Sequence, residues 1–416
     1  MNKLYPNKNI ICIDLKSFFA SCECVERGLD PFKVHLVVAN KKQGNGAITL
    51  AVTPALKEKG VPSRGRLYDI PQSIKYIIVP PRMKLYINKS KEVVSIYLDY
   101  VAPEDLHIYS IDECFLDVTN YLKLYKKNDY ELAQDILRTI KEKTGLTATC
   151  GIGPNLLLAK VAMDIEAKKN KSGIAKWTYD DIENKLWPIT PLSKMWGIGP
   201  RMEKKLNILN IYTIKDLALY DKFKLIDKFG IIGQELWNHA NGIDLSTIND
   251  FKIQPKDKSY SHSQILFKDY NASNIKIIIN EMVEVITSRL RKNNMQSQTI
   301  GFGIGYSKDL NKGFYHTLKL DNPTDDEKEI TNICYLIFEK FYQNYPIRKV
   351  SISCGKLCKK EGIQLNLFSK EETDPSKSTI DEIKDKFGKN SIIKASNLLE
   401  DSTAIERNKK IGGHHE

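Results

Sequence analysis

Acidic residues stand beside two short apolar segments that are far apart in the chain, and this pattern constrains the fold more than any other feature. Residues 10–14, IICID, are apolar and end in the carboxylate of Asp14. Residues 107–119, HIYSIDECFLDVT, place Asp112 and Glu113 between apolar residues. Such runs predict buried β-strands, the second a hairpin with the acidic pair at its bend. A charge beside a buried strand is unfavourable unless it is paired or binds metal.

Carboxylates in this setting suit the transfer of a phosphoryl or nucleotidyl group. That reaction requires charge stabilisation on the attacking and the leaving oxygen, which two divalent ions held by carboxylates commonly supply. Asp14, Asp112 and Glu113 are therefore candidate metal ligands. The alternative is that they are ordinary turn-forming acids. The pattern alone leaves both interpretations open.

The remaining periodicity predicts an α+β fold, because strands and helices mix within the first 175 residues. We expect a helix over 129–143, a strand over 147–152 and a helix with an apolar face over 157–165. Residues 25–78 form a basic insert between the two acidic segments, compatible with a small separate lobe.

The second half of the chain carries two recognisable patterns. Residues 192–208, LSKMWGIGPRMEKKLNI, place a Gly-x-Gly turn before Pro200 at a plausible helix start, as in a helix-hairpin-helix element. Residues 256–356 predict the order β-α-β-β-α-β, an independent domain reached through the polar linker 249–258. Ile380, Ile383 and Phe387 suggest a short amphipathic helix near the C-terminus.

The charge of the chain indicates a polyanionic partner. Its 416 residues, enough for two to four domains, carry a formal net charge of +12. Residues 357–416 contain 11 basic and 11 acidic side chains, so the whole excess lies before them. No apolar run is long enough to cross a membrane, and the start lacks the apolar region of a secretory signal. The eight cysteines form no CxxC pair, so we expect reduced thiols and a cytoplasmic protein.

Two segments resemble the active-site motifs of a known family. DLKSFFASCE (14–23) and YSIDECFLD (109–117) are similar to those of Y-family translesion DNA polymerases, closest to the UmuC-like branch of Gram-positive bacteria and their mobile elements. The resemblance spans about residues 8–356 and implies a right-hand polymerase. It implies a palm (1–24 and 79–175), fingers (25–78), a helix-hairpin-helix thumb (176–245), a little finger (256–356) and a C-terminal tail (357–416).

The resemblance also implies roles for individual residues at the catalytic centre. Asp14, Asp112 and Glu113 would hold two Mg²⁺ ions, with help from the Leu15 carbonyl, so that a primer 3′-hydroxyl attacks the α-phosphate of a deoxynucleoside triphosphate. Lys16 replaces a second acid that is common in the family, so this position is excluded from metal binding.

The resemblance places six residues near the incoming nucleotide. Phe19 matches the steric gate that excludes a 2′-hydroxyl, while the simpler interpretation of the adjacent Phe18 is core packing. Where the family has a triphosphate-binding tyrosine and arginine, this chain has Pro54 and Lys57, so Arg64 and Arg66 would compensate. Two further lysines follow in the sequence, the second after one extra residue relative to the family. The nucleotide-binding candidates are Phe18, Phe19, Lys57, Arg64, Lys160 and Lys168.

Two other motifs concern DNA and a protein partner. Gly197, Gly199, Lys204 and Lys205 would bind a DNA phosphate through the helix-hairpin-helix, although a simple turn between helices is the alternative. Gln364-Leu365-Asn366-Leu367-Phe368 resembles the pentapeptide that binds the bacterial sliding clamp; its glutamine and its anchors Leu365, Leu367 and Phe368 suit a hydrophobic pocket. The alternative is a tail segment that packs on its own domain.

The resulting prediction is a template-directed polymerase that copies past damaged bases on primed DNA. Two other functions remain open at this point. A nucleotide cyclase also uses carboxylates and two metals, and a catalytically inactive accessory protein would also bind DNA and the clamp.

Overall fold

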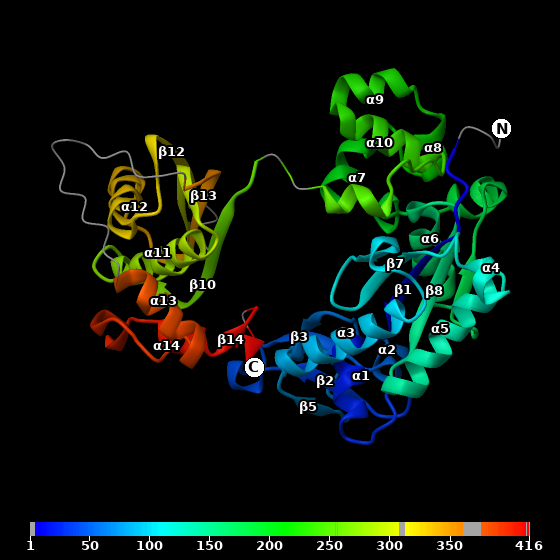
Figure 1. Cartoon of the computed structure of the whole chain (residues 1–416), viewed down its shortest axis with the longest axis horizontal. Helices are drawn as coiled ribbons and strands as arrows, with labels where there is room; N and C mark the ends of the chain where they lie inside the picture. The colour runs from blue at the N-terminus through cyan, green and yellow to red at the C-terminus, as the bar shows by residue number, and fades with distance from the viewer. Residues whose placement is uncertain are drawn as a thin grey trace. The chain divides into compact units, whose positions relative to one another are not determined.

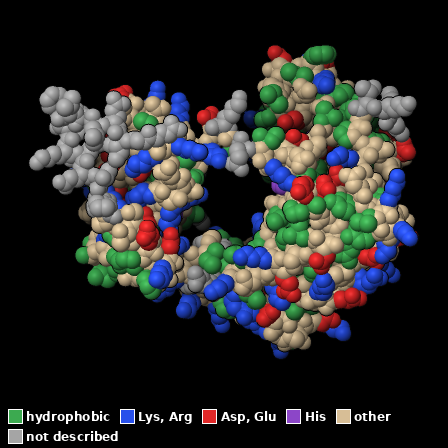
Figure 2. Space-filling model, viewed as in Figure 1, with side chains coloured by type: hydrophobic (Ala, Val, Ile, Leu, Met, Phe, Trp, Pro, Cys, Tyr) green, Lys and Arg blue, Asp and Glu red, His purple; other side chains and the backbone are tan. Residues whose placement is uncertain are grey.

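The chain forms two compact units, each with its own core. The computed structural model describes residues 5–253, 255, 257–307, 313–360, 376–412 and 414–415. The first unit comprises Met1–Ile253 with His414–Glu416, and the second comprises Gln254–Gly413. Figure 1 shows the elements of each unit, and Figure 2 shows Lys and Arg side chains on the visible face of both.

The first unit is built around a five-stranded sheet with the order β6-β7-β1-β8-β9. β1 pairs antiparallel with both β7 and β8, and β8 pairs parallel with β9. The sequence predicted the strand at residues 10–14 and the hairpin, and both are confirmed. The five strands are β1 (Ile10–Leu15), β6 (Leu106–Ile108), β7 (Glu113–Asp117), β8 (Ala148–Gly153) and β9 (Ile174–Lys176).

Alternation along β1 separates two cores, one on each face of this sheet. Ile11 and Ile13 pack on the face covered by α3 and α5. Ile10 and Cys12 pack on the opposite face, with residues of α6. Because side chains alternate with a period of two, Asp14 shares the α6 face with Cys12. The α-helices of this part of the unit are α1 (Phe18–Val25), α3 (Met83–Leu98), α4 (Leu122–Tyr125), α5 (Asp129–Thr144) and α6 (Leu156–Ala162).

The basic insert folds around a small core of its own. Its four-stranded sheet has the order β4-β3-β2-β5, and its strands enclose Val37, Val52 and Leu56. Only β2 and β5 pair in parallel. The elements are β2 (Leu36–Ala39), β3 (Ile48–Val52), α2 (Pro54–Glu58), β4 (Gly65–Arg66) and β5 (Ile77–Val79).

Short helices complete the first unit. The expected Gly-x-Gly turn is present, but the helical segment before it is a single 3-10 turn, Leu192–Lys194. The predicted polar linker is wrong in its first part, because Ile248–Lys252 forms a 3-10 helix whose Phe251 ring stacks on His107 at 4.0 Å. The α-helices here are α7 (Pro200–Asn207), α8 (Ile214–Leu219), α9 (Lys222–Phe229) and α10 (Ile231–Ala240).

The second unit confirms the predicted order β-α-β-β-α-β. Its antiparallel sheet has the order β10-β13-β11-β12, and α11 and α12 cover one face through a core that includes Ile286, Phe302 and Phe338. The elements are β10 (Tyr260–Tyr270), α11 (Ile275–Lys292), β11 (Met295–Tyr306), β12 (Gly313–Thr324), α12 (Glu327–Phe341) and β13 (Ile347–Lys359).

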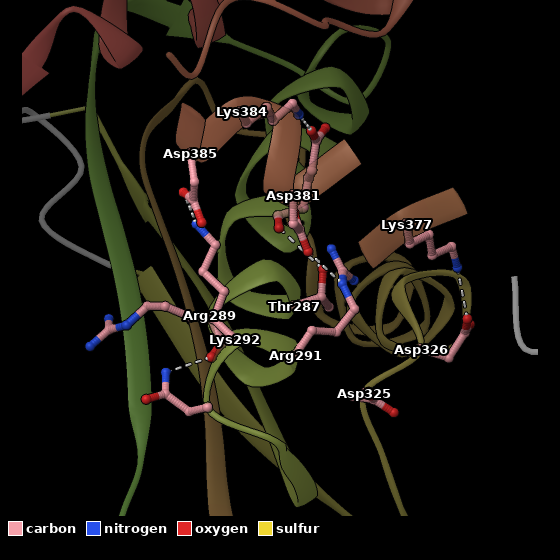
Figure 3. A network of polar contacts seen from close by, with 12 residues as sticks. Thr287, Arg289, Arg291, Lys292, Asp325, Asp326, Lys377, Asp381, Lys384 and Asp385 are labelled. Atoms are coloured by element: carbon pink, nitrogen blue, oxygen red, sulfur yellow. Dashed lines mark hydrogen bonds and ion pairs between the residues drawn. The ribbon is translucent and has the colours of Figure 1, made fainter. Parts of the chain in front are cut away.

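The C-terminal segment packs on the helices of the second unit through charged side chains. Figure 3 shows α13 lying against α11, with Asp381 at 2.8 Å from Arg291. Further along, Glu281 of α11 is 3% exposed and accepts hydrogen bonds from Ser402 and Thr403. It also forms an ion pair with Arg407. We use the name C-terminal clasp for all the described ion pairs that join residues 376–412 to the rest of the second unit.

The clasp segment contains the predicted amphipathic helix. That helix is confirmed as α13, and a 3-10 helix (Ala395–Leu398), one more short α-helix and two short strands follow it. The elements are α13 (Ser376–Phe387), α14 (Ala404–Asn408), β14 (Lys410–Ile411) and β15 (His414–His415). Within the described ranges, no helix combines the length and the apolar character that crossing a membrane requires.

Candidate active site

Pairing of β1 with β7 brings two of the predicted carboxylates together. Asp14 lies directly opposite Glu113 in the antiparallel register, so both side chains stand on the α6 face of the sheet. Glu113 is 7% exposed and is the first residue of β7, so of the pair expected at the bend only Asp112 lies in the turn itself. The buried thiol of Cys12 donates to Glu113 Oε1 at 3.4 Å.

A tight turn before β7 carries the third carboxylate. The backbone N–H groups of Tyr109 and Ser110 both donate to the Glu113 carbonyl, at 2.9 and 3.0 Å. The Ser110 hydroxyl donates to Asp112 Oδ1 at 2.7 Å. The N–H of Leu15 donates to the Asp112 carbonyl at 2.9 Å, which ties the end of β1 to this turn.

Two lysines from one helix reach the acids. Lys160 Nζ lies 2.8 Å from Glu113 Oε1, and Lys168 Nζ lies 3.3 Å from Asp14 Oδ2. Asp164 stands between them and bridges both, at 2.9 and 2.8 Å. The helix continues past α6 as a π-helical turn, Met163–Ala167, which absorbs the extra residue seen in the sequence before Lys168. Asp164 was not predicted, although its spacing of four residues from each lysine is that of helix neighbours.

The six charged groups of this cluster are not balanced. We call Asp14, Asp112, Glu113, Lys160, Asp164 and Lys168 the acidic site; four carboxylates against two ammonium groups leave a formal charge of −2. Burial raises the pKa of Asp14 to about 6, and Asp112 and Glu113 add to the rise, although Lys168 opposes it. Burial favours the neutral form of Lys160, but Asp164 and Glu113 outweigh it and raise the pKa of this lysine.

The carboxylates of the acidic site suit a hard divalent cation, although each of them is bound to another side chain in this structure. Carboxylate oxygens are the ligands that Mg²⁺ prefers, and a charge of −2 with a raised Asp14 pKa describes a site short of positive charge. Each acid is held by a different donor, namely Lys168, Ser110 or Lys160. In the described part of the chain, no three His, Cys, Asp or Glu side chains already converge as ligands of one ion. Metal binding at these residues therefore requires an exchange of partners.

The turn after β1 places two phenylalanines differently. Ser17 adopts a left-handed conformation with φ 49°, uncommon for a residue with a side chain, as the chain bends into α1. Phe18 is 3% exposed and lies in the core, in agreement with its simpler interpretation. Phe19 is half-buried and stacks on Tyr86 of α3, with ring centroids 4.6 Å apart and planes at 22°.

A buried carboxylate that the sequence did not reveal supports this stack. Glu23 has no exposed surface and accepts hydrogen bonds from the Tyr86 hydroxyl at 2.7 Å and from Arg82 at 3.0 and 2.7 Å. Arg27 also pairs with it. The signal was present in the spacing, since Phe19 and Glu23, like Arg82 and Tyr86, are four residues apart on a helix.

The other predicted nucleotide-binding residues differ in their position. Lys57 in α2 stands near the acidic site: partial burial lowers its pKa, with Lys168 adding to the fall and Asp14 and Asp112 opposing it. Arg64 lies in an exposed segment before β4 and has no hydrogen bond or ion pair to the described residues. The structure thus brings Lys57, Lys160 and Lys168 to the carboxylates but not Arg64.

The predicted DNA-binding turn is exposed. Gly197 has φ +90°, a conformation that favours glycine, and a Cβ at Gly197 or Gly199 would meet no atom within 4 Å. Pro200 begins α7, as predicted, and Lys204 and Lys205 lie exposed on that helix. The predicted clamp-binding residues Gln364, Leu365, Leu367 and Phe368 lie outside the described residues.

Comparisons with known proteins agree with this architecture. Residues 13–164 match the impB/mucB/samB family, residues 257–367 match the C-terminal domain of that family, and residues 179–211 match its HHH motif. The chain is 41% identical to the putative UV-damage repair protein UvrX of Bacillus subtilis, over 99% of this chain and 98% of that protein. It is 34% identical to DNA polymerase IV 2 of the same organism, over 99% of this chain and 100% of that protein.

A solved structure shows the same fold. The Y-family DNA polymerase chimera Dbh-Dpo4(243-245)-Dbh superimposes with a TM-score of 0.66 and 21% identity, covering 84% of this chain and 99% of that chain. With the family matches and the full-length relatives, this confirms the resemblance seen in the two motifs. The chain belongs to the impB/mucB/samB family, the Y family of translesion DNA polymerases.

Proposed function

We propose that this translesion DNA polymerase carries out nucleotidyl transfer at the acidic site, with Asp14, Asp112 and Glu113 holding two Mg²⁺ ions and the Leu15 carbonyl assisting. The observation that carries the proposal is the pairing of Asp14 with Glu113 in a cluster of net charge −2, in which Asp14 has a pKa of about 6. Bound magnesium supplies positive charge to the reacting oxygens and the departing pyrophosphate.

The residues of the chain then have distinct tasks. Lys160 and Lys168 offset part of the negative charge of the carboxylates before substrate arrives, and they become available for triphosphate oxygens once the acids bind cations. Lys57 faces the same region and supplies a further positive charge. The exposed Gly197–Gly199 turn, with Lys204 and Lys205, offers backbone N–H groups and charge to a DNA phosphate.

A primer-extension assay with a labelled nucleotide tests the proposal and its alternatives together. Purified protein with primed DNA, deoxynucleotides and Mg²⁺ should lengthen the primer opposite an undamaged and a damaged template base. A cyclic nucleotide product would indicate a cyclase, and DNA binding without any product would indicate an accessory protein. Either outcome would contradict the proposal.

We further propose that Phe19 is the steric gate. Its half-buried ring is held by the stack on Tyr86, which is in turn fixed by buried Glu23, so its position is defined before substrate binds. F19A should raise ribonucleotide insertion relative to deoxynucleotide insertion by about 100-fold or more, the size of a lost steric exclusion. F223A, a change at an exposed ring on α9, is the matched control and should keep the sugar preference of the wild type. An unchanged preference in F19A would refute the assignment.

The clamp interaction and the domain boundaries remain proposals that rest on the sequence. We propose that residues 364–368 bind the bacterial sliding clamp, with the enzyme acting on cytoplasmic DNA, and that the palm, fingers, thumb, little finger and tail follow the predicted boundaries. Alanine at Gln364, Leu367 and Phe368 should abolish co-purification with the clamp and leave distributive extension intact. Co-purification that survives all three changes would reject the motif.

A further inference from the structure

One tryptophan connects the DNA-binding turn with the catalytic turn. Trp196 immediately precedes Gly197, and its indole N–H donates to the Tyr109 hydroxyl at 3.1 Å. The two ring centroids lie 6.0 Å apart at 73°. Trp196 comes from the helical part of the first unit and Tyr109 from the sheet, so the bond joins two elements that are distant in sequence.

Tyr109 belongs to the turn that positions the carboxylates. Its N–H donates to the Glu113 carbonyl, and the next residue, Ser110, donates to the Asp112 carboxylate. A displacement of the Tyr109 ring therefore acts on the same five-residue turn that carries Asp112 and Glu113. Since Tyr109 is 44% exposed, ring packing fixes it only in part, and the bond from Trp196 restricts it further.

Packed rings make this connection stiff. Phe115, which is 1% exposed, contacts both partners, with centroids 5.8 Å from Tyr109 and 6.1 Å from Trp196. His107 contacts both Tyr109 and Phe115, with ring centroids 6.3 Å from each, and stacks on Phe251. Aromatic pairs in such contact favour a defined relative orientation. Movement at the Gly197 turn therefore has a contiguous route to the carboxylates.

We propose that Trp196 is a positioning residue that couples DNA binding at the Gly197–Gly199 turn to the arrangement of the turn carrying Asp112 and Glu113. The inference rests on the proposed function, because it needs DNA at the first turn and nucleotide with Mg²⁺ at the second. DNA that holds the Gly-x-Gly turn also holds Trp196 and, through Tyr109, the catalytic turn. By linkage, nucleotide and Mg²⁺ must then strengthen DNA binding by the same factor.

The test measures that factor by binding rather than turnover. Full-length protein is titrated with a fluorescent primed DNA that ends in a dideoxynucleotide, with and without the next correct deoxynucleoside triphosphate and Mg²⁺. The ratio of the two DNA dissociation constants is the coupling. W196F keeps the ring but loses the N–H, so the coupling should fall about fivefold, the effect of one net hydrogen bond. Its DNA affinity without nucleotide should stay within about twofold of the wild type.

Matched variants separate coupling from a general loss of structure. W237F removes an indole N–H in the same helical part, one that donates to the Tyr220 carbonyl at 3.1 Å, and should keep the wild-type ratio. Y109F should lower the coupling as W196F does, and the double variant should fall no further, because both changes delete one bond.

Two outcomes would overturn the inference: an unchanged ratio in W196F, or an equal loss in W237F. A wild-type protein that extends no primer would contradict the proposed function itself. Normal wild-type extension with an unchanged W196F ratio would contradict the coupling alone.

Discussion

Charged side chains gather at two partly buried places in this chain, and the two differ in how their charges balance. At the acidic site, four carboxylates face two ammonium groups, and the pKa of Asp14 rises to about 6. In the C-terminal clasp, the described ion pairs join seven acids to seven bases: Glu281, Glu284, Asp326, Glu327, Asp381, Asp385 and Asp401 with Lys268, Arg291, Lys292, Lys377, Lys384, Lys394 and Arg407.

The ratio of acidic to basic side chains in each cluster changes the pKa values of its acids. Burial favours the protonated form of Glu284 in the clasp, yet Lys384 and Lys394 outweigh it and lower its pKa. Asp14 is also mostly buried, but burial together with the neighbouring Asp112 and Glu113 outweighs Lys168 and Lys160, so its pKa rises. A cluster with equal numbers of acidic and basic side chains can join two parts of a fold. A cluster with excess negative charge can also bind a cationic ligand.

The strongest test makes the same chemical change in both clusters. D14N should lower the rate of primer extension by about 1,000-fold or more, because a carboxylate that we propose binds Mg²⁺ is lost. D381N removes a carboxylate from the clasp and should extend primers at a rate within about twofold of the wild type. Single-turnover insertion rates at saturating nucleotide measure both. Comparable activity in the two variants would erase the distinction between the clusters.

Loss of a charge in the clasp should lower the stability of the second unit. E281Q leaves Arg407, whose side chain is 17% exposed, without its charged partner and should lower the free energy of unfolding of the second unit by about 3 kcal/mol. The readout is the urea midpoint, followed by proteolytic cleavage within residues 376–412. E339Q changes an exposed acid that pairs with Lys276 at 3.1 Å, and should cost no more than about 0.5 kcal/mol. If E281Q were as mild as E339Q, the clasp would not hold the segment.

At the acidic site, the sign of the stability effect should reverse. The folded pKa of Asp14, about 6, lies above its ordinary value of 3.8, so its contribution to stability is full below pH 4 and is lost as pH rises through 6. D14N should therefore stabilise the protein in EDTA at pH 7.5 by about 2 kcal/mol and make no difference at pH 4. Thermal unfolding at the two pH values checks this. A destabilised D14N at pH 7.5 would show that Lys168 already compensates the acid.

The smallest expected effect concerns Asp164. D164N removes one of the four carboxylates but none of the proposed metal ligands, so the attraction for Mg²⁺ should weaken by about 1 kcal/mol. The Mg²⁺ concentration for half-maximal extension should rise about fivefold, with the maximal rate nearly unchanged. D227N, a change on α9 away from the site, is the control. An unaltered Mg²⁺ requirement in D164N would mean that only the three predicted acids set the local charge.

Much of the fold and of the site could be predicted from the sequence, because both depend on local pattern. The apolar run of residues 10–14 identified β1, and the apolar period of residues 275–290 identified α11. Asp14, Asp112 and Glu113 were identified by their place beside apolar strands and by motif resemblance. These features are written in residue type and spacing, which the chain carries before it folds.

The partners of those residues depended on tertiary structure. The pairing of Asp14 with Glu113, the clasp around Glu281 and the bond from Trp196 to Tyr109 each join residues that are far apart in sequence. Strand register and the packing of helices on sheets decide such contacts, and no local period encodes them. The sequence by itself therefore predicted which groups do the chemistry, while the tertiary structure decided what each group touches and how its charge is compensated.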